Sequence, residues 1–218
     1  MLQETNSVIG GECLLPLFVW PNTDMTAGHV DYIDIFTSYF FPGDVIDYLK
    51  ETEGAIASPG PIGFSEMDPN AYDTIDLYVS PLAYFRIIRA HGRHAEAPIT
   101  GFYSTHLMNF VSAQGLCVAY PDSTLALLGA LQTPTIGSGA TLKGIFRVYS
   151  NDYFTFEKRC FSFPLCGLQR RTFTDPVCLR ILFRSDEYFL TNPHISWSIG
   201  GRPCNNECIP SIRNVDFP

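Results

Sequence analysis

SPLAYFRIIRAHGR, residues 80–93, is the stretch that decides how the rest of the chain is interpreted. It begins with Ser-Pro, which predicts a helix, because a serine hydroxyl caps a helix N-terminus and proline suits the first helical position. Leu82, Phe85 and Ile88 then recur at the spacing of one helix face. Gly92 marks the expected end of this helix, since glycine readily adopts the left-handed backbone found there.

Most of the remaining chain has the pattern of strands separated by turns. The predicted strands are residues 13–20, 29–40, 98–105, 115–120, 141–149, 153–156, 161–165, 177–183 and 188–199. Two short helices are predicted as well, one from Asp44 to Leu49 and one from Ser123 to Leu131, and residues 51–76 read as a long loop rich in proline and glycine. Roughly eight strands between turn signals predict an all-β domain, either a sandwich or a barrel.

The composition favours a chain with apolar surface left over after folding. Hydrophobic residues make up 46% of the 218 residues and charged residues only 17%, whereas about 25% is usual for soluble domains. Aromatic residues account for 14%. The surplus either fills a large sandwich core or remains exposed until a partner protein covers it.

Charge is distributed unevenly along the chain. Residues 1–78 carry 13 acidic residues and the single basic residue Lys50, whereas residues 79–218 carry 9 acidic and 13 basic residues. The net charge is −8. This asymmetry argues against a protein that coats nucleic acid all over, although it permits a local basic patch.

The only basic cluster lies at the end of the predicted helix. Its members are Arg86, Arg89, His91, Arg93 and His94. Cations are favoured at a helix C-terminus, so the cluster could serve to stabilise the helix. Alternatively it could contact the acidic first third of another protein copy, or RNA phosphates.

No motif in the sequence identifies a catalytic, cofactor or metal site. His91 and His94 have Glu96 as their only neighbour at ligand spacing, and Cys204 and Cys208 lack a second pair. The seven cysteines are irregularly spaced, which indicates reduced thiols in a cytosolic protein. The first 12 residues lack a secretory pattern, and no apolar run approaches the ~20 residues that a membrane helix needs.

Three stretches together resemble the jelly-roll capsid proteins of picorna-like viruses. They are FVWPNTDMTAGHVDYIDI at 18–35, SPLAYFRIIRAHGR at 80–93 and VCLRILFRSDEYF at 177–189. The family has a Pro-Leu-x-Tyr-aromatic helix before an Arg-Gly step, and a Gly-Asp-Asp-Phe motif after a late strand. This chain has Gly92-Arg93 in the reverse order and Ser185–Phe189 in place of the glycine form. Its size and cytosolic character are similar to the small coat proteins of the plant secovirus group, and the coat proteins of insect picorna-like viruses are close alternatives.

The resemblance implies an eight-stranded jelly-roll β-sandwich with one or two short helices. It also implies a structural subunit, not an enzyme, that forms an icosahedral shell with other copies and sister capsid proteins around positive-sense single-stranded RNA. The protein would reside in the virion, and in the host cytoplasm before assembly, without membrane contact. The predicted organisation is an N-terminal arm at 1–11, the jelly-roll domain at 12–200 and a C-terminal tail at 201–218.

Two other classes of protein fit the residue types. A lectin-like carbohydrate-binding module would use Trp20, Trp197 and tyrosines as a stacking platform, but both tryptophans lie in apolar predicted strands. A hydrolase on a β scaffold is permitted by the residues present, without a local signature that supports it.

Overall fold

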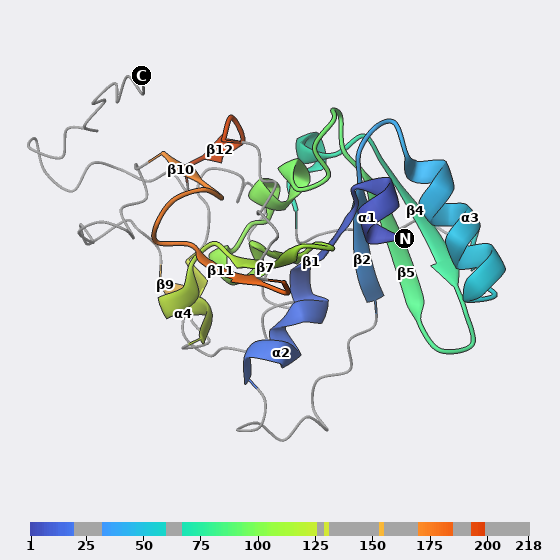
Figure 1. The fold of residues 1–218 in the computed structure, drawn as a ribbon, viewed down its shortest axis with the longest axis horizontal. Helices are drawn as coiled ribbons and strands as arrows, with labels where there is room; N and C mark the ends of the chain where they lie inside the picture. Colours follow the sequence, from blue (N-terminus) through green and yellow to red (C-terminus); the bar gives the residue numbers. More distant parts are fainter. Residues whose placement is uncertain are drawn as a thin grey trace, which may run out of the picture.

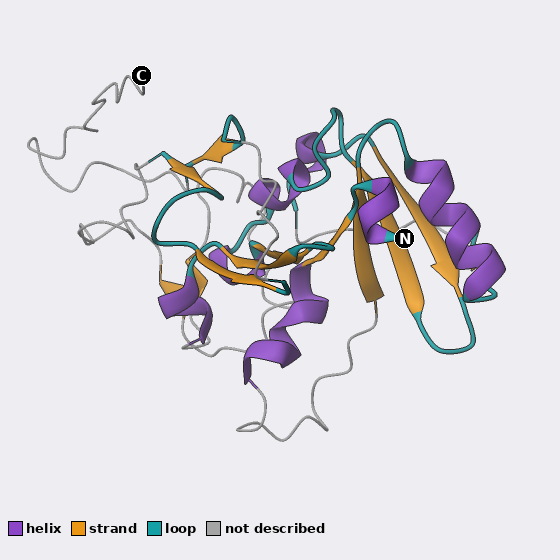
Figure 2. Ribbon diagram, in the orientation of Figure 1, coloured by secondary structure: helices purple, strands orange, loops and turns teal. Residues whose placement is uncertain are grey.

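The computed structural model describes residues 1–19, 32–59, 67–125, 129–130, 153–154, 170–184 and 193–198. These residues form a mostly β structure with one large sheet and several short helices (Figures 1 and 2). The α-helices are α1 (Leu2–Thr5), α2 (Leu15–Val19), α3 (Pro42–Thr52) and α4 (Pro121–Leu125). The 3-10 helices are η1 (Gly11–Leu14), η3 (Pro69–Ala71), η4 (Ala97–Gly101) and η5 (Thr105–Leu107).

Eight strands form the large sheet, in the order β11-β7-β6-β1-β2-β5-β4-β3. Their bounds are β1 (Val8–Gly10), β2 (Tyr32–Thr37), β3 (Ile56–Ala57), β4 (Thr74–Val79), β5 (Tyr84–Arg89), β6 (Asn109–Val111), β7 (Gly115–Val118) and β11 (Leu179–Leu182). The other strands form two-stranded sheets, β8 (Gly129–Ala130) with β9 (Tyr153–Phe154), and β10 (Arg171–Thr172) with β12 (Ser196–Trp197).

The large sheet is mixed and open. Neighbouring strands pair antiparallel except β2 and β5, which run parallel with Tyr32 opposite Tyr84 and Thr37 opposite Arg89. The prediction of a mostly β fold is therefore confirmed. A jelly-roll sandwich is not confirmed, because the described strands place a parallel pair in one open sheet instead of showing two antiparallel sheets face to face.

The helix predicted at 80–93 is wrong: these residues form a hairpin turn, strand β5 and the turn after it. Ser80 does accept hydrogen bonds through its hydroxyl, from the backbone N–H groups of Leu82 (3.2 Å) and Ala83 (3.1 Å). The Ser80 N–H in turn donates to the Ala83 carbonyl at 2.9 Å. This closes the turn between β4 and β5, because a serine that can cap a helix can equally organise a turn.

Strand β5 lacks the usual alternation of apolar and polar residues because both of its faces are buried. One face, with Phe85 and Ile87, packs against Val45 and Leu49 of α3. On the other face Ile88 belongs to a second, larger core cluster with partners from many elements. A run of buried residues on both faces satisfies a helix pattern as easily as a strand pattern.

The N-terminal residues are also integrated into the sheet. Strand β1 lies between β2 and β6, so residues 8–10 are not a free arm as predicted. Residues 13–20, predicted as a strand, instead contain parts of η1 and the short helix α2. Pro16 fits there because the first turn of a helix needs no N–H donor from it.

The remaining expectations have mixed outcomes. Strands β2, β7 and β11 confirm the predictions at 29–40, 115–120 and 177–183, and α3 confirms the helix after Pro42 but is longer than predicted. The strand predicted at 98–105 is wrong, since η4 and η5 occupy this stretch. The predicted strands at 141–149 and 161–165 and the tail at 201–218 lie outside the described residues. The domain boundaries stay predictions.

Candidate interaction surface

The parallel pairing of β2 and β5 brings two turns together at one edge of the sheet. Both strands end at this edge, so the residues after Thr37 and the residues after Arg89 become neighbours in space. Two backbone hydrogen bonds join the turns, from the Ala90 N–H to the Thr37 carbonyl (2.9 Å) and from the Tyr39 N–H to the Gly92 carbonyl (2.8 Å). We call the exposed side chains here the aromatic–basic rim, which consists of Tyr39, Phe40, Phe41, His91 and Arg93.

Three consecutive aromatic residues supply the apolar part of the rim. Tyr39 is 50% exposed, Phe40 59% and Phe41 45%. Their rings contact one another edge to face, with centroids 5.7 Å apart for Tyr39 and Phe40 and 6.4 Å apart for Phe40 and Phe41. These contacts order the rings without covering them, so a rigid apolar surface faces solvent.

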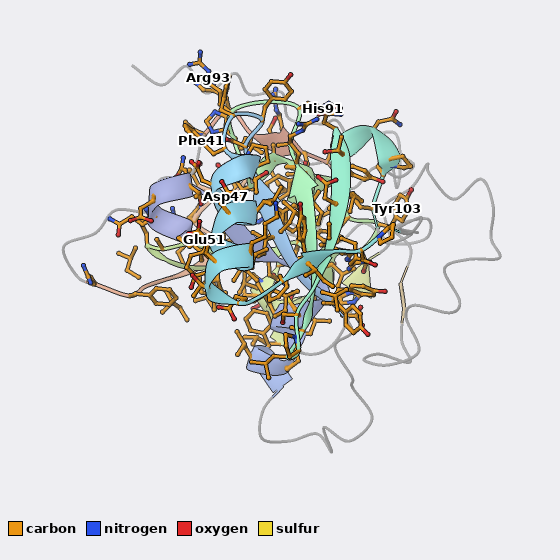
Figure 3. All side chains as sticks on the ribbon, turned by 90° about the vertical axis from the view of Figure 1, so that its right-hand side faces the viewer. Phe41, Asp47, Glu51, His91, Arg93 and Tyr103 are labelled. Atoms are coloured by element: carbon orange, nitrogen blue, oxygen red, sulfur yellow. The ribbon has the colours of Figure 1, made fainter. Side chains whose placement is uncertain are left out.

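His91 and Arg93 supply the basic part. Both side chains are exposed, and Figure 3 shows them at the same end of the molecule as Phe41. His94 is half-buried, with its Nδ1 atom 3.9 Å from Oε1 of the more deeply buried Glu96. Of the predicted basic cluster, the turn thus presents His91 and Arg93 most openly.

The two arginines on β5 have structural roles instead. Arg86 is buried and donates from Nε to Oδ1 of Asp34 (2.5 Å) and from Nη2 to Oδ2 (2.9 Å). It also stacks on Tyr32, with Cζ 4.7 Å from the ring centroid. Because a buried carboxylate and a guanidinium satisfy one another in this geometry, Arg86 is not available to RNA or to a partner protein.

Arg89 lies between the interior and the rim. Its Nη2 atom is 2.5 Å from Oδ2 of Asp73, and its Cζ atom lies 5.3 Å from the ring centroid of Tyr39. About 30% of each charged side chain is exposed. Arg89 therefore positions Tyr39 at the rim while its charge is compensated by Asp73.

The buried pair Ser104 and His106 has no room for a substrate beside it. Ser104 Oγ and His106 Nδ1 are 2.7 Å apart, a spacing that a nucleophile and its base could use. Both residues are buried, however, and a Cβ atom built on Gly129 would lie only 2.3 Å from that Nδ1 and 2.4 Å from that Oγ. The backbone at Gly129 fills the space that a substrate would need.

A second interior group joins Cys117 and Cys178 to Arg171. The Arg171 guanidinium is buried, pairs with Asp175 and donates to Sγ of Cys178 at 3.5 Å. A hydrogen bond from Cys117 and the positive charge of Arg171 lower the pKa of the Cys178 thiol, while that bond and burial raise the pKa of Cys117. Among the described residues, Cys13, Cys117 and Cys178 are free thiols. That all seven cysteines are reduced stays a prediction.

Trp197 does not offer a stacking face for a sugar. It is buried against Phe173, with ring centroids 4.6 Å apart, and its Nε1 donates to the Tyr120 hydroxyl at 3.0 Å. Trp20 lies outside the described residues. Among the residues that the structure describes, no three metal-ligating side chains come together, and no helix is long and apolar enough to cross a membrane.

The comparisons with known proteins give no family for this chain: no protein-family model, curated protein or solved structure matches it. The aromatic part of the rim was missed by the sequence analysis. Three large aromatics directly before Pro42-Gly43, where α3 begins, are a usable signal, because a connecting segment rarely buries three successive side chains.

Proposed function

We propose that this protein is a structural viral coat protein, a subunit that builds an icosahedral shell with other copies and sister proteins around single-stranded RNA. The proposal rests on the resemblance in the sequence and on one structural observation. That observation is the presence of large apolar side chains exposed at separate places on the molecule, three of which are the rim, the turn and start of β5, and the edge strand β11.

The three places are far apart. The rim lies after the carboxyl end of β5. Leu82 (90% exposed) lies in the turn before that strand and Tyr84 (50%) at its start, roughly 20 Å from the rim at ~3.3 Å per residue. The third place is the edge strand β11 with Phe183 just after it, separated from β5 by four strands of the same sheet, or roughly 24 Å at ~4.8 Å per step.

Separate apolar places of this kind suit a subunit with several neighbours. A protein that acts alone rarely exposes large apolar patches, and a single partner would cover one side only. A shell needs several modest interfaces per subunit, each on the order of 1,000 Å² or more, and gains its stability from their number.

β11 adds a backbone contribution to this argument. It pairs with β7 along one side, and in the described part of the chain it forms the end of the sheet. Ile181, Leu182 and Phe183 are 47%, 41% and 57% exposed. An exposed apolar edge strand can pair with a strand of another chain. In a monomeric protein this edge would promote aggregation, whereas in an assembly it can form an interface.

The basic cluster contributes little to RNA packaging in this proposal. Arg86 and Arg89 are engaged with Asp34 and Asp73, which leaves too few exposed cations at the rim to neutralise many phosphates. Contact between the rim and the genome stays a prediction. The jelly-roll sandwich also belongs to the proposal, and an experimental structure of an assembled particle would test it directly.

The test is to observe assembly. Sedimentation velocity on the purified full chain at rising concentration is expected to show growing oligomers, and negative-stain electron microscopy of its natural source material should show round particles that contain nuclease-protected RNA. A chain that remains a single copy at the highest concentration, together with source material free of particles, would overturn the proposal.

A further inference from the structure

The outer face of α3 carries a charge opposite to that of the rim. Asp44, Asp47, Tyr48 and Glu51 follow the i, i+3, i+4, i+7 spacing and therefore lie on one stripe of the helix. All four are exposed, whereas Val45 and Leu49 on the opposite side are buried in the core. Three carboxylates thus surround one tyrosine, and Figure 3 shows Asp47 and Glu51 on the outer side of the helix.

The aromatic–basic rim has the complementary composition. It presents His91 and Arg93 beside three exposed rings, and both surfaces are built on rigid elements. The rim sits on two turns joined by backbone hydrogen bonds, and α3 is an 11-residue helix that packs on the sheet. Surfaces that are already ordered lose little entropy on association.

One molecule cannot join its own rim to its own α3 face. The aromatic segment of the rim ends at Phe41, the residue before the helix, and α3 extends away from it for 11 residues with Val45 and Leu49 fixed in the core. The acidic stripe points outward along this length. The matching surfaces can therefore meet only between two copies.

We propose that the aromatic–basic rim of one copy docks on the outer face of α3 of a second copy. The inference rests on the proposed function and specifies one of its interfaces. Arg93 and His91 face the carboxylates of Asp47 and Glu51, and Phe40 and Phe41 pack around Tyr48. Because the two surfaces differ, one such contact leaves a free rim on one copy and a free helix face on the other, and further copies can occupy them to build a ring or a shell.

Charge reversal on each surface tests this contact. One full-length variant carries His91→Glu and Arg93→Glu, and the other carries Asp47→Lys and Glu51→Lys. Each alone faces like charges at the interface and is expected to weaken self-association at least about tenfold in sedimentation velocity. An equimolar mixture should recover most of the loss, because the unchanged rim of one variant meets the unchanged helix of the other and the two reversed surfaces also match.

Matched controls change charge elsewhere. Asp122→Lys on α4 and Arg170→Glu beside β10 alter exposed residues away from α3 and the rim (Figure 1), and both should associate like the unchanged protein. Circular dichroism checks that each variant is folded. A chain with all four reversals again has opposite charges on the two surfaces, so it should associate normally. It keeps the proposal testable if one of the double variants does not fold.

The outcomes separate the two proposals. If the unchanged chain associates but a rim or α3 variant associates equally well, or if the mixture and the fourfold variant recover nothing, the docking proposal is wrong and the coat-protein proposal survives. If the unchanged chain never associates, the docking proposal is wrong, and the coat-protein proposal is wrong too only when the source material also lacks particles.

Discussion

Strand β5 and the turn that follows it use the same kind of residue in opposite ways. Arg86 in the strand is buried in a two-bond ion pair with Asp34, whereas Arg93 in the turn, seven residues later, is exposed beside three aromatic rings. One cluster in the sequence therefore divides into a structural part and a surface part. The division follows from where the strand ends, because the sheet buries both faces of β5 and leaves its carboxyl end at the surface.

The strongest test of this division removes the buried guanidinium. Arg86→Met leaves the Asp34 carboxylate buried without its main partner, which is expected to cost ~3–5 kcal/mol of unfolding free energy. Arg93→Met should change it by less than about 0.5 kcal/mol, because its side chain is exposed. Urea denaturation followed by circular dichroism measures both values.

A double substitution makes that test specific. Asp34→Leu combined with Arg86→Met removes both charges and should be markedly more stable than Arg86→Met alone, since no uncompensated charge remains buried. Equal losses for Arg86→Met and Arg93→Met would show that the two arginines are not divided in this way.

A buried and an exposed histidine offer a second comparison between the interior and the surface, through the dependence of stability on pH. Burial lowers the pKa of His106 from 6.5 to about 4, so its imidazole stays neutral in the folded protein at pH values where the unfolded chain is already protonated. The unfolded state then binds more protons, and stability falls as pH decreases from about 6.5 to 4, by up to about 3 kcal/mol from this group. His91, which is exposed, serves as the surface control.

The measurement compares stability at pH 7 and pH 4.5 in three proteins. Because carboxylates also titrate in this range, the informative quantity is the difference from the unchanged protein. His106→Gln should lose less stability on acidification than the unchanged protein, while His91→Gln should lose the same amount. If both variants lose the same amount, the contrast between the interior and the surface histidine is wrong.

Local patterns predicted the elements whose signals are unambiguous. The partial alternation in β2 and the apolar runs in β7 and β11 each favour a strand, and each was predicted. A helix was predicted from Asp44 onward, and α3 begins two residues earlier, at Pro42. Strand β5 was missed because Ser-Pro begins turns as well as helices, and because burial of both faces removes the alternation that identifies a half-buried strand.

The site was predictable only in part for a related reason. The basic residues were found from their spacing, but the separation of Arg86 and Arg89 from Arg93 depends on pairing with β2, about fifty residues away in the chain. The proximity of Tyr39–Phe41 to His91 depends on the same parallel pairing. Parallel neighbours far apart in sequence leave no local signal in either strand.

The turn at the opposite end of β5 provides the smallest and most specific test. Ser80→Ala removes the hydroxyl that accepts from the Leu82 and Ala83 N–H groups and should cost about 1 kcal/mol, since it deletes the turn's side-chain acceptor while the Ser80 N–H bond to the Ala83 carbonyl remains. Ser80→Asp should retain most of the stability, because a carboxylate can accept the same bonds. Thr52→Ala, at the exposed end of α3, is the control and should have little effect. Replacing Ala83 by proline separates the hairpin from a helix. In a helix over residues 80–93 the proline would lie in the first turn and would be tolerated. In this hairpin the Ala83 N–H donates a hydrogen bond, so the substitution should destabilise the protein more than Ser80→Ala does.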